Sequence, residues 1–88
     1  MEPDEAILGY SVGRVVFTDH ARRRMRRRRL DAETVYETLR NPTITLPRYG
    51  DETQEFRRRV GLRTHFVVVD YAREEWLRII TTGWSGDP

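Results

Sequence analysis

The segment FTDHARRRMRRRRLDAETVYETLRNP (residues 17–42) decides the fold, because it contains the helical signals of the chain. It has no glycine, its only proline is its last residue, and arginine is a good helix former. Thr18 or Asp19 can cap a first helix, and Asp31 can cap a second helix that an Asn-Pro pair ends. The segment therefore predicts two short helices, with a break near Arg29–Asp31.

Outside this segment the pattern is that of strands. GRVVFT (13–18) precedes the helices, and four alternating or apolar runs follow them: TITLPRY, TQEFRRRV, HFVVVDY and WLRIITTGW. HFVVVDY is the most apolar of these and is predicted to be the central strand. The order predicts an α+β domain in which two N-terminal helices pack on one face of a mainly antiparallel sheet of four to five strands. The other face would meet water or a ligand.

The composition indicates one small domain. Its 88 residues, 38% of them hydrophobic, can bury one modest core. We expect an acidic N-terminal extension over residues 1–12, an α+β core over 13–84 and a frayed tail over 85–88. Cysteine is absent, which excludes disulfides and cysteine-type zinc sites. The N-terminus does not resemble a signal peptide and no apolar run is long enough to cross a membrane, so we expect a cytoplasmic protein that does not bind membranes.

The basic residues are all arginine and they are clustered. Sixteen residues are Lys or Arg, none of them is lysine, and half of them lie between residues 14 and 29. A guanidinium group matches phosphate geometry and stacks on bases, which favours nucleic acid, RNA more than DNA, as the partner. A GC-rich coding sequence or selection for high temperature would also replace lysine by arginine, but neither explains the clustering.

On a helix the arginine run separates into faces. At about 100° per residue, Ala21 and Met25 form a narrow apolar stripe that must face the sheet. His20, Arg24 and Arg28 follow one another along one edge of that stripe. The arginines expected to bind substrate on this edge are Arg24, Arg27 and Arg28, and those expected to point to solvent are Arg22 and Arg26.

His20 is the candidate acid/base. A neutral imidazole beside phosphate-binding arginines could remove a 2′-hydroxyl proton, so that the oxygen attacks the adjacent phosphate while the cations stabilise the developing charge. This chemistry needs no metal. A histidine in the first turn of a helix is also a common capping or surface residue, and that reading stays open beside the catalytic one.

Arg57 and Arg59 are further candidates for binding substrate. They share one face of a predicted strand and could follow a phosphate backbone across the open side of the sheet. Pairing with an acid such as Glu55 on a solvated strand face is the alternative.

The last strand offers a candidate hydroxyl. Simple alternation places Thr82 on the face opposite to Leu77 and Ile79, which makes Thr82 rather than Thr81 the hydroxyl expected to face a ligand and take part in catalysis. His65 begins the central strand, and two histidines without carboxylates at helical spacing make a poor metal site. We therefore expect no metal and no cofactor.

The sequence resembles a family of small bacterial and archaeal domains with a strand, then His-Ala-x-x-Arg-Met, a second arginine, a helix ending in Asn-Pro, and a last strand with a threonine. The resemblance covers residues 14–84, and one departure is Arg29, which stands where the family usually has glycine. The matching residues are His20, Ala21, Arg24, Met25, Arg28, Asn41, Pro42 and Thr81 or Thr82. The family is grouped with RelE-like toxins, in the barnase–EndoU–colicin–RelE fold class of metal-independent ribonucleases.

The resemblance implies a RelE-type toxin-like domain that acts on RNA as a metal-independent ribonuclease. Together with the line of His20, Arg24 and Arg28 on one helix edge, it makes His20 the acid/base candidate. Two alternatives remain. The first is a nucleic-acid-binding module that does not cut, and the second is an interaction protein whose basic helix docks an acidic, antitoxin-like partner. Whether the chain forms a homodimer is open.

Overall fold

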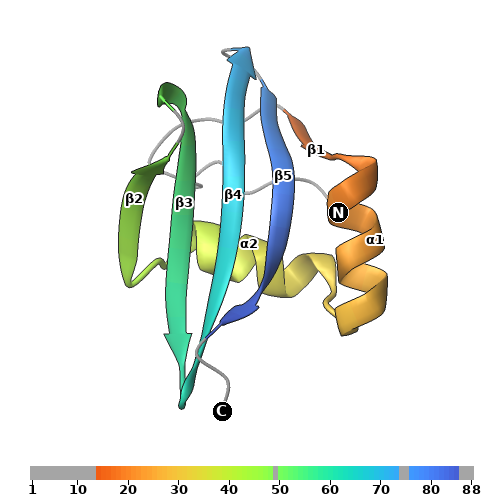
Figure 1. The fold of residues 1–88 in the computed structure, drawn as a ribbon, viewed down its shortest axis with the longest axis vertical. Helices are drawn as coiled ribbons and strands as arrows, with labels where there is room; N and C mark the ends of the chain where they lie inside the picture. Colours follow the sequence, from red (N-terminus) through yellow and green to blue (C-terminus); the bar gives the residue numbers. More distant parts are fainter. Residues whose placement is uncertain (1–13, 49, 74–75, 86–88) are drawn as a thin grey trace.

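A computed structural model of the chain describes residues 14–48, 50–73 and 76–85. The element order is strand, two helices and four strands (Figure 1). The bounds are β1 Arg14–Phe17, α1 Asp19–Arg28, α2 Ala32–Arg40, β2 Ile44–Arg48, β3 Gly50–Val60, β4 Arg63–Arg73 and β5 Trp76–Ser85. The predicted extension over residues 1–12 and most of the predicted tail lie outside the described residues.

Local capping explains where α1 begins and ends. The Thr18 hydroxyl accepts a hydrogen bond from the Ala21 backbone N–H at 3.1 Å, so Thr18 rather than Asp19 is the N-cap. After α1, Arg29 adopts the left-handed conformation with φ 54°, and the Leu30 N–H donates to the Met25 carbonyl at 2.9 Å. The predicted break between the two helices is therefore confirmed. It occurs at Arg29, in a backbone conformation that glycine adopts more readily than arginine.

Asp31 is the N-cap of α2, as predicted. Its Oδ1 accepts hydrogen bonds from the Thr34 N–H at 2.9 Å and from the Thr34 hydroxyl at 2.7 Å. These hydrogen bonds, above all the one from the hydroxyl, lower the pKa of Asp31. The helix ends at Arg40, just before the Asn-Pro pair that stops it.

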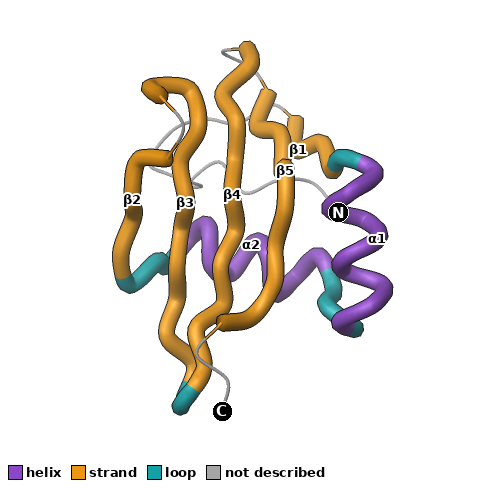
Figure 2. Tube along the Cα trace, in the orientation of Figure 1, coloured by secondary structure: helices purple, strands orange, loops and turns teal. Residues whose placement is uncertain are grey.

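The five strands form one mixed sheet in the order β1-β5-β4-β3-β2 (Figure 2). β1 pairs with β5 in parallel, and the other three pairs are antiparallel. β4 is central, as its apolar sequence predicted. α2 runs behind β3, β4 and β5, and α1 lies beside the β5 edge (Figure 1). The α+β class and the helix count are thus confirmed.

The core lies between the helices and the rear face of the sheet. Leu39 of α2, Val67 of β4 and Leu77 and Ile79 of β5 are almost completely buried there. No described helix covers the opposite face, which we call the open face. Residues that pair across the strands share a face, so the register assigns side chains to the core or to the open face.

A β-bulge in β5 overturns one prediction. Val67 pairs with Thr82 and Val69 pairs with Ile79, so β5 has two residues between these pairs where β4 has one. The extra residue reverses the alternation beyond it. Thr82 consequently lies on the core face with Ile79, and Thr81, which pairs with Val68, lies on the open face. The prediction that Thr82 faces a ligand is therefore wrong.

Candidate nucleic-acid interface

Arg24 reaches from α1 onto the open face, across the part of β5 that does not pair with β1. Its Nε donates a hydrogen bond to the Thr82 carbonyl at 3.0 Å. Its terminal Nη2 lies over Gly83, because a Cβ atom added at Gly83 would be only 2.8 Å from Nη2. Glycine at this position therefore leaves the space that the guanidinium group occupies.

The same glycine brings an aromatic ring next to Arg24. Gly83 pairs with Phe66 of β4, and a Cβ atom at Gly83 would be 3.1 Å from Phe66 Cζ. Phe66 is half-buried on the open face. The Arg24 guanidinium and the Phe66 ring thus lie side by side above the Gly83 backbone.

A second arginine continues this row. Phe66 pairs with Arg57 of β3, so Gly83, Phe66 and Arg57 lie on adjacent strands of one face, each about 4.8 Å from the next. The row Arg24–Phe66–Arg57 therefore has an aromatic residue between two arginines. We call it the open-face row.

Arg57 is paired, but only in part. Its Nε contacts Glu55 Oε2 at 2.5 Å, as the alternative reading of the sequence anticipated, and its side chain is still 43% exposed. The Nη atoms of Arg57 make no hydrogen bond or ion pair with a described residue. Arg59 lies on the same face, where it pairs with Thr64, and it is exposed. Its Nε donates a hydrogen bond to the Gly61 carbonyl at 3.1 Å. Both predicted strand arginines thus lie on the open face.

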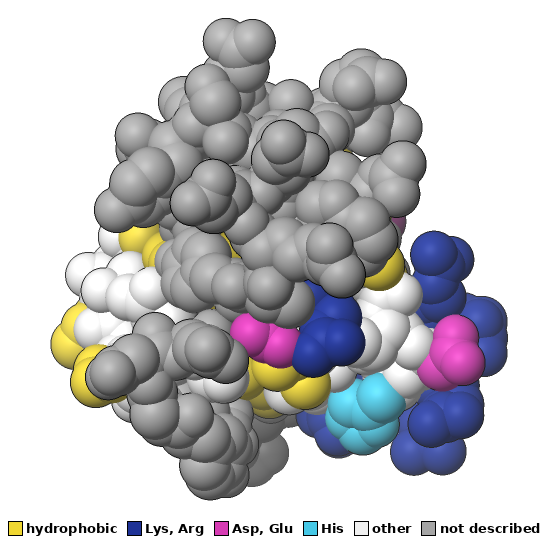
Figure 3. Space-filling view, turned by 90° about the horizontal axis from the view of Figure 1, so that it is seen from above, with side chains coloured by type: hydrophobic (Ala, Val, Ile, Leu, Met, Phe, Trp, Pro, Cys, Tyr) yellow, Lys and Arg dark blue, Asp and Glu magenta, His cyan; other side chains and the backbone are white. Residues whose placement is uncertain are grey.

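His20, Arg27 and Arg28 are exposed on α1. None of the three makes a hydrogen bond or ion pair with a described residue, so no contact fixes the imidazole against a cation. Figure 3 shows a histidine together with arginine side chains on the side of the molecule where α1 lies. The structure places Arg24 beside Phe66, in one row with Arg57, whereas His20 is exposed on the same helix.

Thr82 belongs to a buried network around His65 instead. Both residues are fully buried. Thr82 Oγ1 donates its only hydrogen to the Phe66 carbonyl at 2.8 Å, so it must accept one from His65 Nε2 at 3.1 Å. His65 Nδ1 then accepts from the Thr38 hydroxyl at 2.6 Å, and Thr38 accepts from Arg58 Nε at 3.1 Å. The network assigns a neutral ring that carries its proton on Nε2.

Electrostatics support this assignment. Burial, and secondarily the charge of Arg58, lower the pKa of His65 to about 4. Sequence reasoning missed this role of His65, because Thr38 is 27 residues away in the sequence. The role is structural, since the network leaves the ring no accessible nitrogen atom.

Two other kinds of site are not found in the described part of the chain. Residues 14–48, 50–73 and 76–85 hold no group of three or more histidine, cysteine or acidic side chains that could bind a metal ion. No helix in these same ranges is long and apolar enough to cross a membrane.

The comparison with family models identifies the domain. Residues 17–84 match the family described as Domain of unknown function (DUF4258). The chain belongs to this family. The match covers α1 and Arg24, the central strand and Gly83, so all of the open-face row lies within the family's domain. No curated protein matches, and no solved structure matches.

Proposed function

We propose that this DUF4258 domain binds single-stranded RNA on its open face, in the manner of a RelE-like RNA-acting domain of the cytoplasm. The observation that carries the proposal is the open-face row, in which Gly83 lets Arg24 lie beside Phe66 and the register adds Arg57. Aromatic rings stack on unpaired bases, and guanidinium groups bind phosphates and stack as well.

The charge distribution supports a polyanionic partner. None of the seven arginines between residues 22 and 29 forms an ion pair with a described residue, whereas Arg40, Arg57 and Arg78 each contact a carboxylate. Unpaired guanidinium groups repel one another along α1, and a phosphate backbone would relieve that repulsion.

Fluorescence anisotropy with a labelled single-stranded RNA tests the proposal. Arg24→Gln should weaken binding about tenfold, as expected when a charged hydrogen-bonding contact is lost. Arg23→Gln is the matched control, because Arg23 is exposed on the same helix and its loss changes the net charge equally. Equal losses in both variants would contradict a role for the row, and no binding by the wild type would reject the RNA-binding function.

RNA cleavage is a second candidate function. His20 is exposed on the same helix as Arg24, one turn before it, and is therefore accessible to a bound strand. As a general base, the imidazole would take the 2′-hydroxyl proton, and the 2′-oxygen would bond to the adjacent phosphorus as the bond to the 5′-oxygen breaks. The 5′-oxygen would take a proton from water, the product would be a 2′,3′-cyclic phosphate, and the imidazolium would return its proton to solvent. Arg24 and Arg28 would stabilise the charge on the phosphate.

Incubation of RNA with the wild type and with His20→Ala, in the presence of a chelator, tests this candidate. Products from the wild type alone would establish His20 as a catalytic residue. Identical products from both proteins, or none from either, would leave a binding domain. A stable complex with an acidic protein, with no retention of RNA, would instead favour a protein-docking role for α1.

A further inference from the structure

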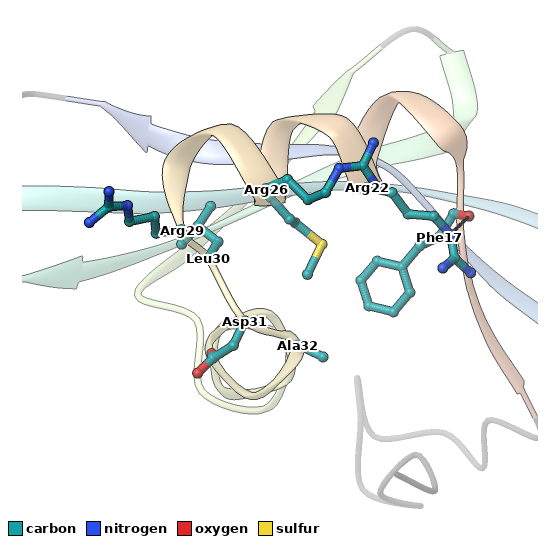
Figure 4. Close-up of a pocket in the computed structure, with 8 residues that line it drawn as sticks. Phe17, Arg22, Arg26, Arg29, Leu30, Asp31 and Ala32 are labelled. Carbon is teal, nitrogen blue, oxygen red and sulfur yellow. Dashed lines mark hydrogen bonds between the residues drawn. The ribbon is translucent and has the colours of Figure 1, made fainter.

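A hollow of about 480 Å³ opens between α1 and the start of α2 (Figure 4). Arg24 is not among the residues that line it. Apolar residues of three elements line it: Phe17 ends β1, Met25 lies in α1 and Ala32 begins α2. All three side chains are half-buried. The hollow therefore has an apolar floor that remains accessible.

Charged residues also line the hollow, namely Arg22, Arg26, Arg29 and Asp31. Arg22 and Arg26 are one helical turn apart and both line the hollow. The Arg22 Nε donates a hydrogen bond to the Phe17 carbonyl at 3.4 Å, and Figure 4 shows the guanidinium group next to this carbonyl. The sequence predicted that Arg22 and Arg26 point to solvent. They are indeed exposed, but neither pairs with a described carboxylate, and both are available to an anion above the apolar floor.

We propose that this hollow binds one nucleotide, with its base against Phe17 and Met25 and its phosphate on Arg22 and Arg26. A volume of this size is in the range of small-molecule pockets. An amphipathic partner helix would need apolar anchors over several turns, and a free inorganic anion would leave the apolar floor uncovered. The choice of a nucleotide as the ligand rests on the proposed function. The hollow would be a second binding site besides the open-face row, occupied either by a free nucleotide or by one nucleotide of an RNA strand.

Met25 provides a direct readout, because Met1 and Met25 are the only methionines of the chain. In a protein labelled with ¹³C at the methionine methyl groups, nucleoside monophosphates are titrated first, then single-stranded RNA, then inorganic phosphate. A base above Met25 should move its methyl signal by the ring current and leave the Met1 signal unchanged. A response to monophosphates identifies a free-nucleotide site, and a response to RNA alone identifies a strand subsite.

Variants separate this site from the open-face row. Ala32→Leu should fill the hollow and remove the Met25 response, while Phe66→Leu should retain it. Arg26→Gln should weaken the response several-fold more than its matched control Arg23→Gln. The inference is overturned if inorganic phosphate gives the same shift, if the shift survives in Ala32→Leu, or if no ligand moves the Met25 signal. RNA binding that persists without any Met25 response would overturn only this site and leave the proposed function intact.

Discussion

The Arg24 guanidinium lies over Gly83, where the Cβ atom of any other residue would come within 2.8 Å of Nη2. Arg24 and Gly83 thus depend on each other although they are 59 positions apart in the sequence. Gly83 has no side chain, and this leaves room for the guanidinium group of Arg24. This relationship brings a cation onto the open face of the sheet.

Gly83→Ala should weaken RNA binding without unfolding the protein. The added methyl group must displace the flexible end of Arg24 and press on Phe66, whose ring atoms are 3.1 and 3.2 Å from the Cβ position. We expect about a fivefold loss of affinity in the wild-type background. In the Arg24→Gln background the loss should be smaller. Anisotropy of the double-mutant cycle measures the coupling, and additive losses would show that Gly83 and Arg24 act independently.

The dependence of RNA affinity on salt should distinguish charge from stacking. Arg24→Gln removes one proposed phosphate contact, so the slope of log K against log [salt] should become less steep by about 0.7 for single-stranded RNA. Phe66→Leu removes an uncharged ring and should leave this slope unchanged. A titration with salt for each variant provides both slopes, and a changed slope in Phe66→Leu would contradict the assignment of the ring to base stacking.

Arg29→Gly should stabilise the fold. Arg29 has φ 54°, a left-handed conformation that costs roughly 1–2 kcal/mol for a residue with a Cβ atom. Glycine avoids this cost, but its greater freedom in the unfolded chain offsets part of the benefit. We expect the free energy of unfolding to rise by about 1 kcal/mol. Urea unfolding measures it. Arg29→Gln, which loses the same charge and keeps the Cβ atom, should show no such gain.

The stability of the fold should fall between pH 6.5 and 4. The folded-state pKa of His65 is about 4, below its ordinary value of 6.5, so the unfolded chain takes up the proton first as the pH falls. The contribution of neutral His65 is fully present above pH 6.5 and is lost as the pH approaches 4, a change of about 3 kcal/mol. Urea unfolding at a series of pH values measures this change. His65→Gln should be less stable at pH 7, and its stability should depend less on pH between 6.5 and 4. If its stability depends on pH as strongly as that of the wild type, the pH dependence comes from other groups.

The helices and their caps could be predicted because their signals are local. Thr18, Asp31 and the Asn-Pro pair act within one turn of the residues that they cap, so a short window of sequence contains the relevant chemistry. The identity of the central strand followed in the same way from its apolar run. The left-handed Arg29 could not be predicted from a residue type that rarely adopts this conformation.

The candidate site could be predicted only in part, because it depends on long-range pairing. The prediction that Arg24 and Arg57 bind phosphate remains a prediction; the structure places both in one row, and the aromatic residue between them was missed. Phe66 becomes part of the row only through its pairing with Gly83 and Arg57. The assignment of Thr82 failed at the bulge, since one extra residue reverses the alternation. A glycine inside the last strand was the available signal, because such a glycine often marks a close approach.

The affinity of Phe66→Leu for single-stranded RNA, at a fixed salt concentration and relative to a duplex of the same sequence, tests the central claim most directly. Stacking of one base on the ring predicts about a tenfold weaker affinity for the single strand and little change for the duplex, whose bases are already stacked. Unchanged single-strand affinity, or an equal loss for both RNAs, would contradict an RNA interface on the open face.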